Sequence, residues 1–226
     1  MATFASLQKQ ADELIRKGLE GSVFVAPYSE DTEITALMDT EGGLAALPDG
    51  YEDVGLITKD QGVSWSRDVE TSDVESLGRA EPTRRDVTSD VTGIEFTMQE
   101  MKALTLELYE GVSLSDVVAD AAGTTHSNVV FDKPDRPASI YYRALALFKD
   151  GEGADAFYFA KWLPRVQVTD RSEQSWNEED EVQFGVTMTA FNDSDFGTAV
   201  RTLLGVPTAL IGKMGFSNGG GGGVEG

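Results

Sequence analysis

The chain has 226 residues, of which 40% are hydrophobic and 25% charged, and it contains no cysteine. This composition is typical of a folded globular protein and excludes disulfide bonds, thiolate nucleophiles and zinc–thiolate sites. The net charge of -21 opposes binding to nucleic-acid phosphates, and no run approaches the ~20 apolar residues of a membrane span. We therefore expect a protein that is made in the cytoplasm, does not enter a membrane and does not bind nucleic acid tightly.

The first predicted element is a short helix at the N-terminus. Apolar residues between Phe4 and Leu19 recur at near-helical spacing, and glycines follow as stop signals. This segment, residues 1–21, either caps the core of its own domain or forms an arm that docks on a neighbouring copy. Residues 22–27 predict a strand, and the glycine- and proline-interrupted residues 28–50 predict mostly loop.

Alternating apolar and polar residues predict the next strands. Residues 54–56 and 63–69 are expected to form two short strands joined by a tight turn at residues 60–62, and residues 94–98 a third strand. The polar residues 70–92 are predicted to form a long inter-strand loop. Loops of this length are usually functional or disordered.

The middle of the chain predicts one helix followed by a hairpin. Residues 101–108 favour a helix because good helix formers dominate, although the leucine spacing also suits a strand. Residues 139–148 and 156–168 are rich in aromatic side chains and predict two strands joined by a turn at residues 149–153. Pro164 cannot donate to a strand ladder, so it predicts an edge or a bulge.

The remaining residues complete a mostly β (α+β) fold. Residues 182–190 alternate strictly and predict a strand, and the glycine-rich residues 217–226 predict a flexible tail. The N-terminal arm (1–21) and this tail would flank one β domain, residues 22–216. We expect a β-sandwich or barrel-like subunit with one or two short helices, a long inter-strand loop and flexible terminal arms.

No catalytic or cofactor-binding constellation emerges from the residues. Residues 151–156 match a dinucleotide-binding fingerprint, but a strand is predicted after them where that motif needs a helix. Residues 193–197 resemble the start of a calcium loop but lack its third ligand and closing glutamate. His126 is the only histidine, and the sequence has no nucleophile-elbow motif with which it could form a catalytic triad. The acidic run 178–181 is typical of a solvated turn. We predict no enzymatic activity, no cofactor and no metal site.

The scarce basic residues gather in the predicted long loop. Arg79, Arg84 and Arg85 lie there beside Glu81 and Asp86. Arginine offers a bidentate fork to carboxylates, so this cluster is suited to bind the acidic face of another copy. Local charge balance within the loop explains the same cluster equally well.

Three stretches carry a resemblance to a known family. Residues 47–111, which begin LPDGYEDVGLITKDQG, are followed by FAKWLPRVQVTD at 159–170 and VQFGVTMTAFND at 182–193. In this order they resemble the major tail protein of siphophages, especially those that infect actinobacteria. The resemblance rests on a long pattern of strand, loop, strand and helix rather than on a catalytic signature.

The resemblance implies a structural virion protein rather than an enzyme. Its copies would close into hexameric rings whose inward strands form one β-barrel, and the rings would stack into a tail tube for DNA ejection. DNA would pass through the lumen without specific binding. The loop 70–92 and the terminal segments would bridge successive rings, which favours an inter-ring interface that contains Arg79, Glu81, Arg84, Arg85 and Asp86.

The resemblance also implies partners and a location. The partners would be the tape-measure, tail-tip and tail-terminator proteins, and the protein would lie in the virion tail after assembly in the host cytoplasm. Two alternatives remain on the residues alone. A virion decoration or attachment module would share the β-sandwich and the acidity, and a hydrolytic β-sandwich would need convergent carboxylates in a cleft.

Overall fold

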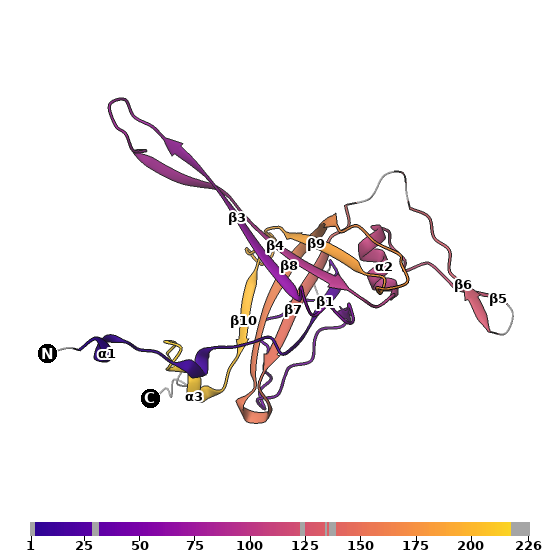
Figure 1. Cartoon of the computed structure of the whole chain (residues 1–226), viewed down its shortest axis with the longest axis horizontal. Coiled ribbons are helices and arrows are strands. Elements are labelled where there is room, and N and C mark those ends of the chain that lie inside the picture. The colour runs from indigo at the N-terminus through magenta and orange to yellow at the C-terminus, as the bar shows by residue number, and fades with distance from the viewer. Residues whose placement is uncertain (1–2, 29–31, 123–124, 134, 136–138, 218–226) are drawn as a thin grey trace, which may run out of the picture.

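The computed structural model describes residues 3–28, 32–122, 125–133, 135 and 139–217 (Figure 1). Its main sheet has the strand order β2-β1-β7-β8-β9-β4-β3, with β10 also paired to β8, and all of its pairings are antiparallel. The strands are β1 (Glu20–Pro27), β2 (Glu52–Asp53), β3 (Val63–Val74), β4 (Arg84–Met98), β5 (Asp120–Ala122), β6 (His126–Asn128), β7 (Tyr142–Asp150), β8 (Phe157–Arg171), β9 (Phe184–Ala190) and β10 (Arg201–Gly205). The helices are α1 (Phe4–Leu7), α2 (Ala103–Glu110) and α3 (Thr208–Ile211), with 3-10 turns η1 (Asp12–Leu14) and η2 (Gly153–Asp155). The predicted mostly β fold is confirmed.

Two layers of strands enclose the main core. The first half of β8 pairs with β7 and β10, and its second half pairs with β9, which leads on to β4 and β3. Buried side chains from both layers meet between them, as expected for a sandwich. They include Val23 and Val25 of β1, Ile94, Phe96 and Met98 of β4, Ala144 of β7, Leu163 and Val166 of β8, and Val186 and Met188 of β9.

α2 covers part of this core. It packs beside β9, with Leu108 fully buried and the Thr105 hydroxyl donating to the Val54 carbonyl at 3.4 Å. Gly111 ends the helix at φ +72°, a left-handed conformation that glycine adopts without strain. The helix predicted over residues 101–108 is thus confirmed, with a shift of two residues.

A second core lies on the outer face of β1, β7 and β8. The predicted loop that follows β1 folds back over these strands and buries apolar side chains against them. The members of this core are Ile34, Leu37, Leu145, Ala160, Trp162 and Leu203. Because both faces of the sheet are covered here, residues Tyr142 to Ala146 are all buried, and all of them except Arg143 are apolar or aromatic.

Tyr51 ties the second core to the sheet. Its hydroxyl accepts a hydrogen bond from the Trp162 indole N–H at 2.7 Å and donates to the Thr32 carbonyl at 3.0 Å. Burial raises the pKa of Tyr51 to about 12, so the hydroxyl keeps its proton for donation.

Several predicted strands are confirmed. β1 and β9 match the strands expected at 22–27 and 182–190, and β7 and β8 form the expected hairpin. Pro164 lies in a β-bulge of β8, where Leu163 pairs with Ala144 and Val166 pairs with Tyr142. A bulge leaves an extra residue outside the ladder, so the missing proline N–H costs no hydrogen bond.

The long loop predicted over residues 70–92 is wrong. β3 continues to Val74 and β4 begins at Arg84, so only residues 75–83 connect them. The two strands pair along their whole length, with one bulge after Glu70. The prediction failed because the few valines of this ladder are scattered among polar residues. A strand is recognised from sequence when apolar residues recur at every second position on one face.

Two further predictions need correction. The expected tight hairpin of 54–56 with 63–69 does not form, because β2 pairs with β1 and Ile57 bridges to Met98 of β4. The expected N-terminal helix is reduced to α1 and the turn η1. A short helix gains most of its stability from packing, and the apolar side chains of this segment, such as Phe4 and Ile15, are exposed.

Other elements were absent from the sequence prediction. β5, β6, β10 and α3 are short, and none has the length or regular alternation that identifies a strand or helix by pattern. From residue 218 onward, the glycine-rich tail lies outside the described residues. None of the helices in the described ranges has the length and apolarity needed to cross a membrane.

Tyr51→Phe should destabilise the protein by about 1–3 kcal/mol, because it leaves the buried Trp162 N–H without its acceptor. Urea unfolding followed by circular dichroism measures the change in the free energy of unfolding. Tyr158→Phe is the matched control, since no hydrogen bond to that hydroxyl occurs in the described structure, and it should change stability by less than about 0.5 kcal/mol. Equal losses in the two variants would contradict the role given to Tyr51.

Candidate assembly surfaces

One face of the second layer is polar, and most of its side chains are short or acidic. It is the side of β8, β9, β4 and β3 that faces away from the main core, as the cross-strand register shows. We call it the polar face. It consists of Gln167, Thr169 and Asp170 of β8, Gly185, Thr187 and Thr189 of β9, Gly93, Glu95 and Thr97 of β4, and Ser64, Ser66 and Asp68 of β3, with the exposed Val91 of β4 opposite Asp68 at its margin.

Hydrogen bonds between neighbouring strands connect the side chains of the polar face. Gln61 accepts from the Thr97 hydroxyl and donates to Glu95, both at 2.7 Å. The Thr169 and Thr189 hydroxyls lie 2.8 Å apart. A Cβ on Gly93 would lie 2.5 Å from the Ser66 hydroxyl, so glycine permits this close approach. The strand residues of the face include three carboxylates and no lysine or arginine, so it repels anions.

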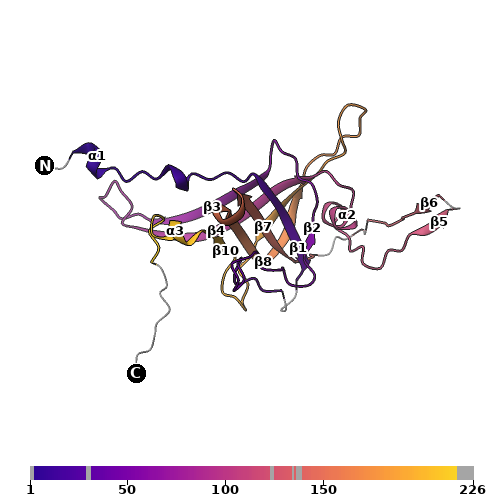
Figure 2. The same ribbon diagram turned by 90° about the horizontal axis from the view of Figure 1, so that it is seen from below.

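The β3–β4 ladder extends beyond the body of the subunit as a hairpin (Figures 1 and 2). We use "the hairpin" for residues 67–92. No strand in the described structure pairs with the second edge of β3. Apolar side chains on the hairpin are exposed, among them Leu77 at its tip and Val87, which is 64% exposed. An isolated two-stranded ladder is marginally stable in water, and an open edge favours pairing with another chain.

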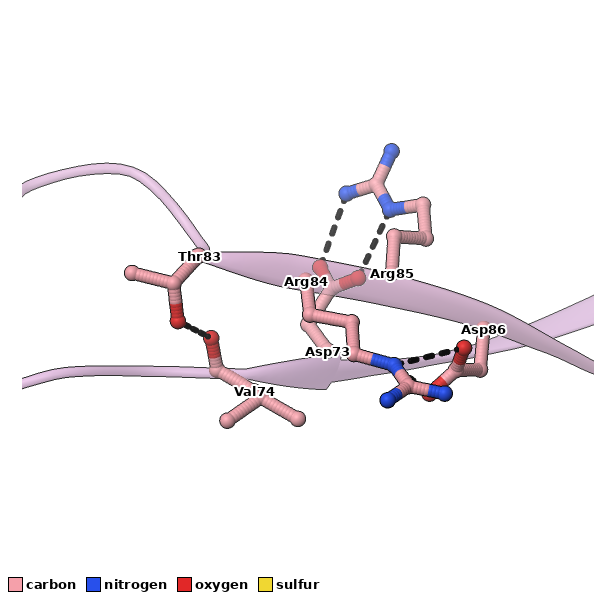
Figure 3. A network of polar contacts seen from close by, with 6 residues as sticks. All are labelled: Asp73, Val74, Thr83, Arg84, Arg85 and Asp86. Carbon is pink, nitrogen blue, oxygen red and sulfur yellow. Dashed lines mark hydrogen bonds and ion pairs between the residues drawn. The ribbon is translucent and has the colours of Figure 1, made fainter.

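The structure divides the predicted arginine cluster between the two faces of the hairpin (Figure 3). Arg85 makes a bidentate contact with Asp73, its cross-strand neighbour, with both N–O distances at 2.7 Å. Arg84 points to the opposite face and contacts Asp86 at 2.8 Å. The guanidinium groups are exposed, and most of their N–H donors stay available to another molecule.

Arg79 and Glu81 lie in the connection at the hairpin tip, and neither forms an ion pair with another described residue. The structure therefore supports local charge balance for Arg84 and Arg85, but not for Arg79. Sequence analysis missed Asp73 as the partner of Arg85, since that contact depends on the strand register. A matching exposed pair, Arg67 and Asp90 at 2.6 Å, was missed for the same reason.

The N-terminal arm leaves the body on the same side of the molecule as the hairpin (Figures 1 and 2). Its apolar side chains Phe4, Leu7 and Ile15 are all exposed. Glu13 of the arm contacts Lys213, which follows α3, at 2.6 Å. The arm thus meets the C-terminal segment but buries little apolar surface within its own subunit.

The rejected motifs occupy ordinary structural positions. Residues 151–156 form the turn between β7 and β8. Asp193 is buried, and its carboxylate accepts the Asp195 backbone N–H at 2.9 Å, which shapes the turn over residues 193–197. His126 is exposed on β6 beside the Thr125 hydroxyl. Across the described ranges, no group of three His, Asp or Glu side chains is arranged to hold a metal ion.

Comparison with protein families decides the class of the chain. A model for phage tail tube proteins matches residues 9–204, which is most of the sequence. The chain belongs to the phage tail tube protein family. This tail tube protein is therefore a structural component of the phage tail in the virion, and not an enzyme. No curated protein matches the sequence.

The tail tube protein also has weak likenesses among solved structures. One is the tail of an empty gene transfer agent particle with C6 symmetry, at 10% identity and a TM-score of 0.38 over 83% of this chain and 98% of that chain. A second is a native gene transfer agent virion, at 10% identity and 0.35 over 80% and 95%. A third is Hcp1 from E. coli EAEC 042, at 10% identity and 0.29 over 80% and 96%. Likenesses this weak do not decide how the chain assembles.

The ion pairs of the hairpin predict a specific titration behaviour. Hydrogen bonding to Arg85 lowers the pKa of Asp73 below the usual 3.8, and Arg67 does the same for Asp90. Because these pKa values are lowered, each pair stabilises the hairpin above about pH 4, and the effect is lost as the pH falls through the folded pKa.

NMR titration of the carboxyl carbons measures both pKa values. Arg85→Gln should return the pKa of Asp73 towards 3.8 and leave the pKa of Asp90 lowered. Asp90 therefore serves as the internal control in this variant. If the pKa of Asp73 is the same with and without Arg85, the bidentate contact does not exist in solution.

Proposed function

We propose that copies of this tail tube protein close into hexameric rings, and that the rings stack into a tube through which the phage genome passes. The observation that carries this proposal is the polar face, a hydrogen-bonded sheet surface of small and acidic side chains. Such a surface suits a wall past which DNA slides.

The polar face supports this role through its negative charge and its short side chains. Glu95, Asp170 and Asp68 repel the DNA backbone at distances up to the Debye length, ~8 Å at physiological salt. Lysine or arginine at the same positions would bind phosphates and release counterions, which holds DNA in place. Glycine, serine and threonine keep the remaining surface low, so that few long side chains enter the lumen.

The strand edges support closure into a ring. β3 has one unpaired edge in the described structure, and its first residues, 63–66, lie in the body at the margin of the polar face. Pairing this edge with a neighbouring copy would extend the sheet from subunit to subunit, and closure of a sheet removes its edges. A continuous barrel around the lumen then follows from six equivalent contacts.

The hairpin and the N-terminal arm support stacking. Both leave the body with exposed apolar side chains, and a neighbouring ring would cover them. The hairpin residues predicted at the inter-ring interface are Arg79, Glu81, Arg84, Arg85 and Asp86. We also propose assembly in the host cytoplasm, with the tape-measure, tail-tip and tail-terminator proteins as partners.

Arg84→Glu combined with Arg85→Glu should abolish tubes, because it reverses the charge of the proposed interface on an acidic protein. Negative-stain electron microscopy of purified protein over a concentration series tests the proposal, with hollow tubes expected for the wild type. Lys102→Glu is the control, since it breaks an exposed ion pair with Glu100 outside the hairpin and should still form tubes. Tubes of normal length from the double variant would refute the interface.

Glu95→Lys combined with Asp170→Lys should leave tubes intact but make them retain DNA. Pelleting of tubes with short duplex DNA at several salt concentrations measures the effect, and retention should fall steeply as salt rises. Glu152→Lys combined with Glu20→Lys changes the net charge equally on exposed residues away from the polar face and should not cause retention. Equal retention by both double variants would exclude the polar face as the lumen wall.

A further inference from the structure

The part of the sheet that carries the polar face ends in an open edge on each side. Its strands lie in the order β8, β9, β4 and β3, and β8 joins this layer only from Val166 onward, where it pairs with β9. Within the described ranges, no strand lies on the far side of β3. β7 pairs with β8 only as far as Val166, whose partner is Tyr142, so residues 167–171 have no described strand on that side either.

The directions of these four strands allow the two open edges to meet between copies. All three pairings from β8 to β3 are antiparallel, so β8 and β3 run in opposite directions within one subunit. Rotation about the axis of a ring carries β8 of one copy to the next copy without reversing it. β3 of one copy would therefore meet β8 of the next in an antiparallel ladder, which is the kind that joins the other strands of this layer.

The side chains at the two edges also match. Trp65 of β3 and Val168 of β8 both pack against the main core, and both are only partly buried within their own subunit. An antiparallel ladder with Trp65 opposite Val168 sets the register. It also places Ser66 opposite Gln167, and both of these belong to the polar face. Apolar side chains then pair with apolar ones and polar with polar, as cross-strand packing favours.

Other open edges fit β3 less well. β2 also lies at an edge of the sheet, but it has only two residues. β10 pairs with β8 alone in the described structure and belongs to the layer of β7, so a ladder of β3 with β10 would interrupt the polar face. Two β3 edges would pair about a two-fold axis, which closes a dimer and leaves the edge of β8 uncovered.

We infer that the open edge of β3 in one copy pairs with residues 167–171 of β8 in the next copy of the same ring. The polar face then continues from copy to copy without a break, and Trp65 and Val168 cover each other. This inference rests on the proposed closure into rings and names the strand edge that receives β3.

The absence of cysteine from the chain allows a test by oxidation of single-cysteine variants. Ser66→Cys protein is mixed with Gln167→Cys protein, assembled and oxidised, since directly opposed residues of a ladder bring their Cβ atoms within reach of a disulfide. We expect disulfide-linked dimers on a non-reducing gel. Ser66→Cys alone reports pairing of two β3 edges, and Ser66→Cys mixed with Thr202→Cys reports pairing with β10. Neither of these matched controls should be linked.

Hydrogen exchange of the wild type gives a second measurement that needs no substitution. Backbone N–H groups of residues 63–66 and 167–171 that face the open edges should exchange at least about tenfold more slowly in tubes than in unassembled protein, because ladder hydrogen bonds protect them. The same comparison for β10, residues 201–205, should show no such slowing.

The outcomes separate this inference from the proposed function. Tubes in which exchange at residues 167–171 is unchanged overturn the edge assignment and leave the tube intact, and so do disulfides in either control mixture. Slower exchange without a disulfide between positions 66 and 167 supports the edges and overturns only the register. Protein that never assembles overturns the closure into rings, and the edge pairing falls with it.

Discussion

A β-bulge at Pro164 and Arg165 lets one strand serve both layers of the subunit. Before the bulge, β8 pairs with β10 on its outer side, and after it β8 pairs with β9 on that same side. The residue opposite the bulge is Arg143, which is fully buried, with its guanidinium 4.9 Å from the centre of the Phe196 ring. Aromatic faces offset part of the cost of burying that charge. The sandwich, and with it the position of the polar face, depends on this change of partner.

The subunit leaves much of its chain outside the two cores. The hairpin, the N-terminal arm and the segment around β5 and β6 all expose apolar side chains that a monomer does not cover. For a protein that acts alone, such surfaces favour aggregation. In the proposed tail tube, other copies would cover these surfaces. The high negative charge opposes contact between copies, so the few arginines of the hairpin would make the proposed contact more specific.

In the proposed tube, the sheet that carries the polar face would be both a structural layer and a passage wall. Its inner side packs into the main core, whereas its outer side carries glycine, hydroxyl, amide and carboxylate groups, with Val91 at its margin. Successive side chains of a strand point to opposite sides of the sheet, so alternate residues can be apolar for the core and polar for the outer side. Substitutions of the core-facing side chains should therefore change stability more than substitutions of the exposed carboxylates on the other side.

Local sequence patterns were enough to predict the β class, the helix at α2, the strands β1 and β9, the β7–β8 hairpin and an edge or a bulge at Pro164. These elements are visible in sequence because their burial imposes a local period or a local backbone constraint. The long resemblance from residue 47 to 111 also determined the family. The fold was needed to establish that residues 70–92 include a paired ladder, that Arg85 contacts Asp73, and that β2 pairs with β1. Cross-strand register pairs residues that are far apart in the chain. Where neither face of a ladder has regularly spaced apolar residues, no alternating pattern in the sequence reveals that pairing.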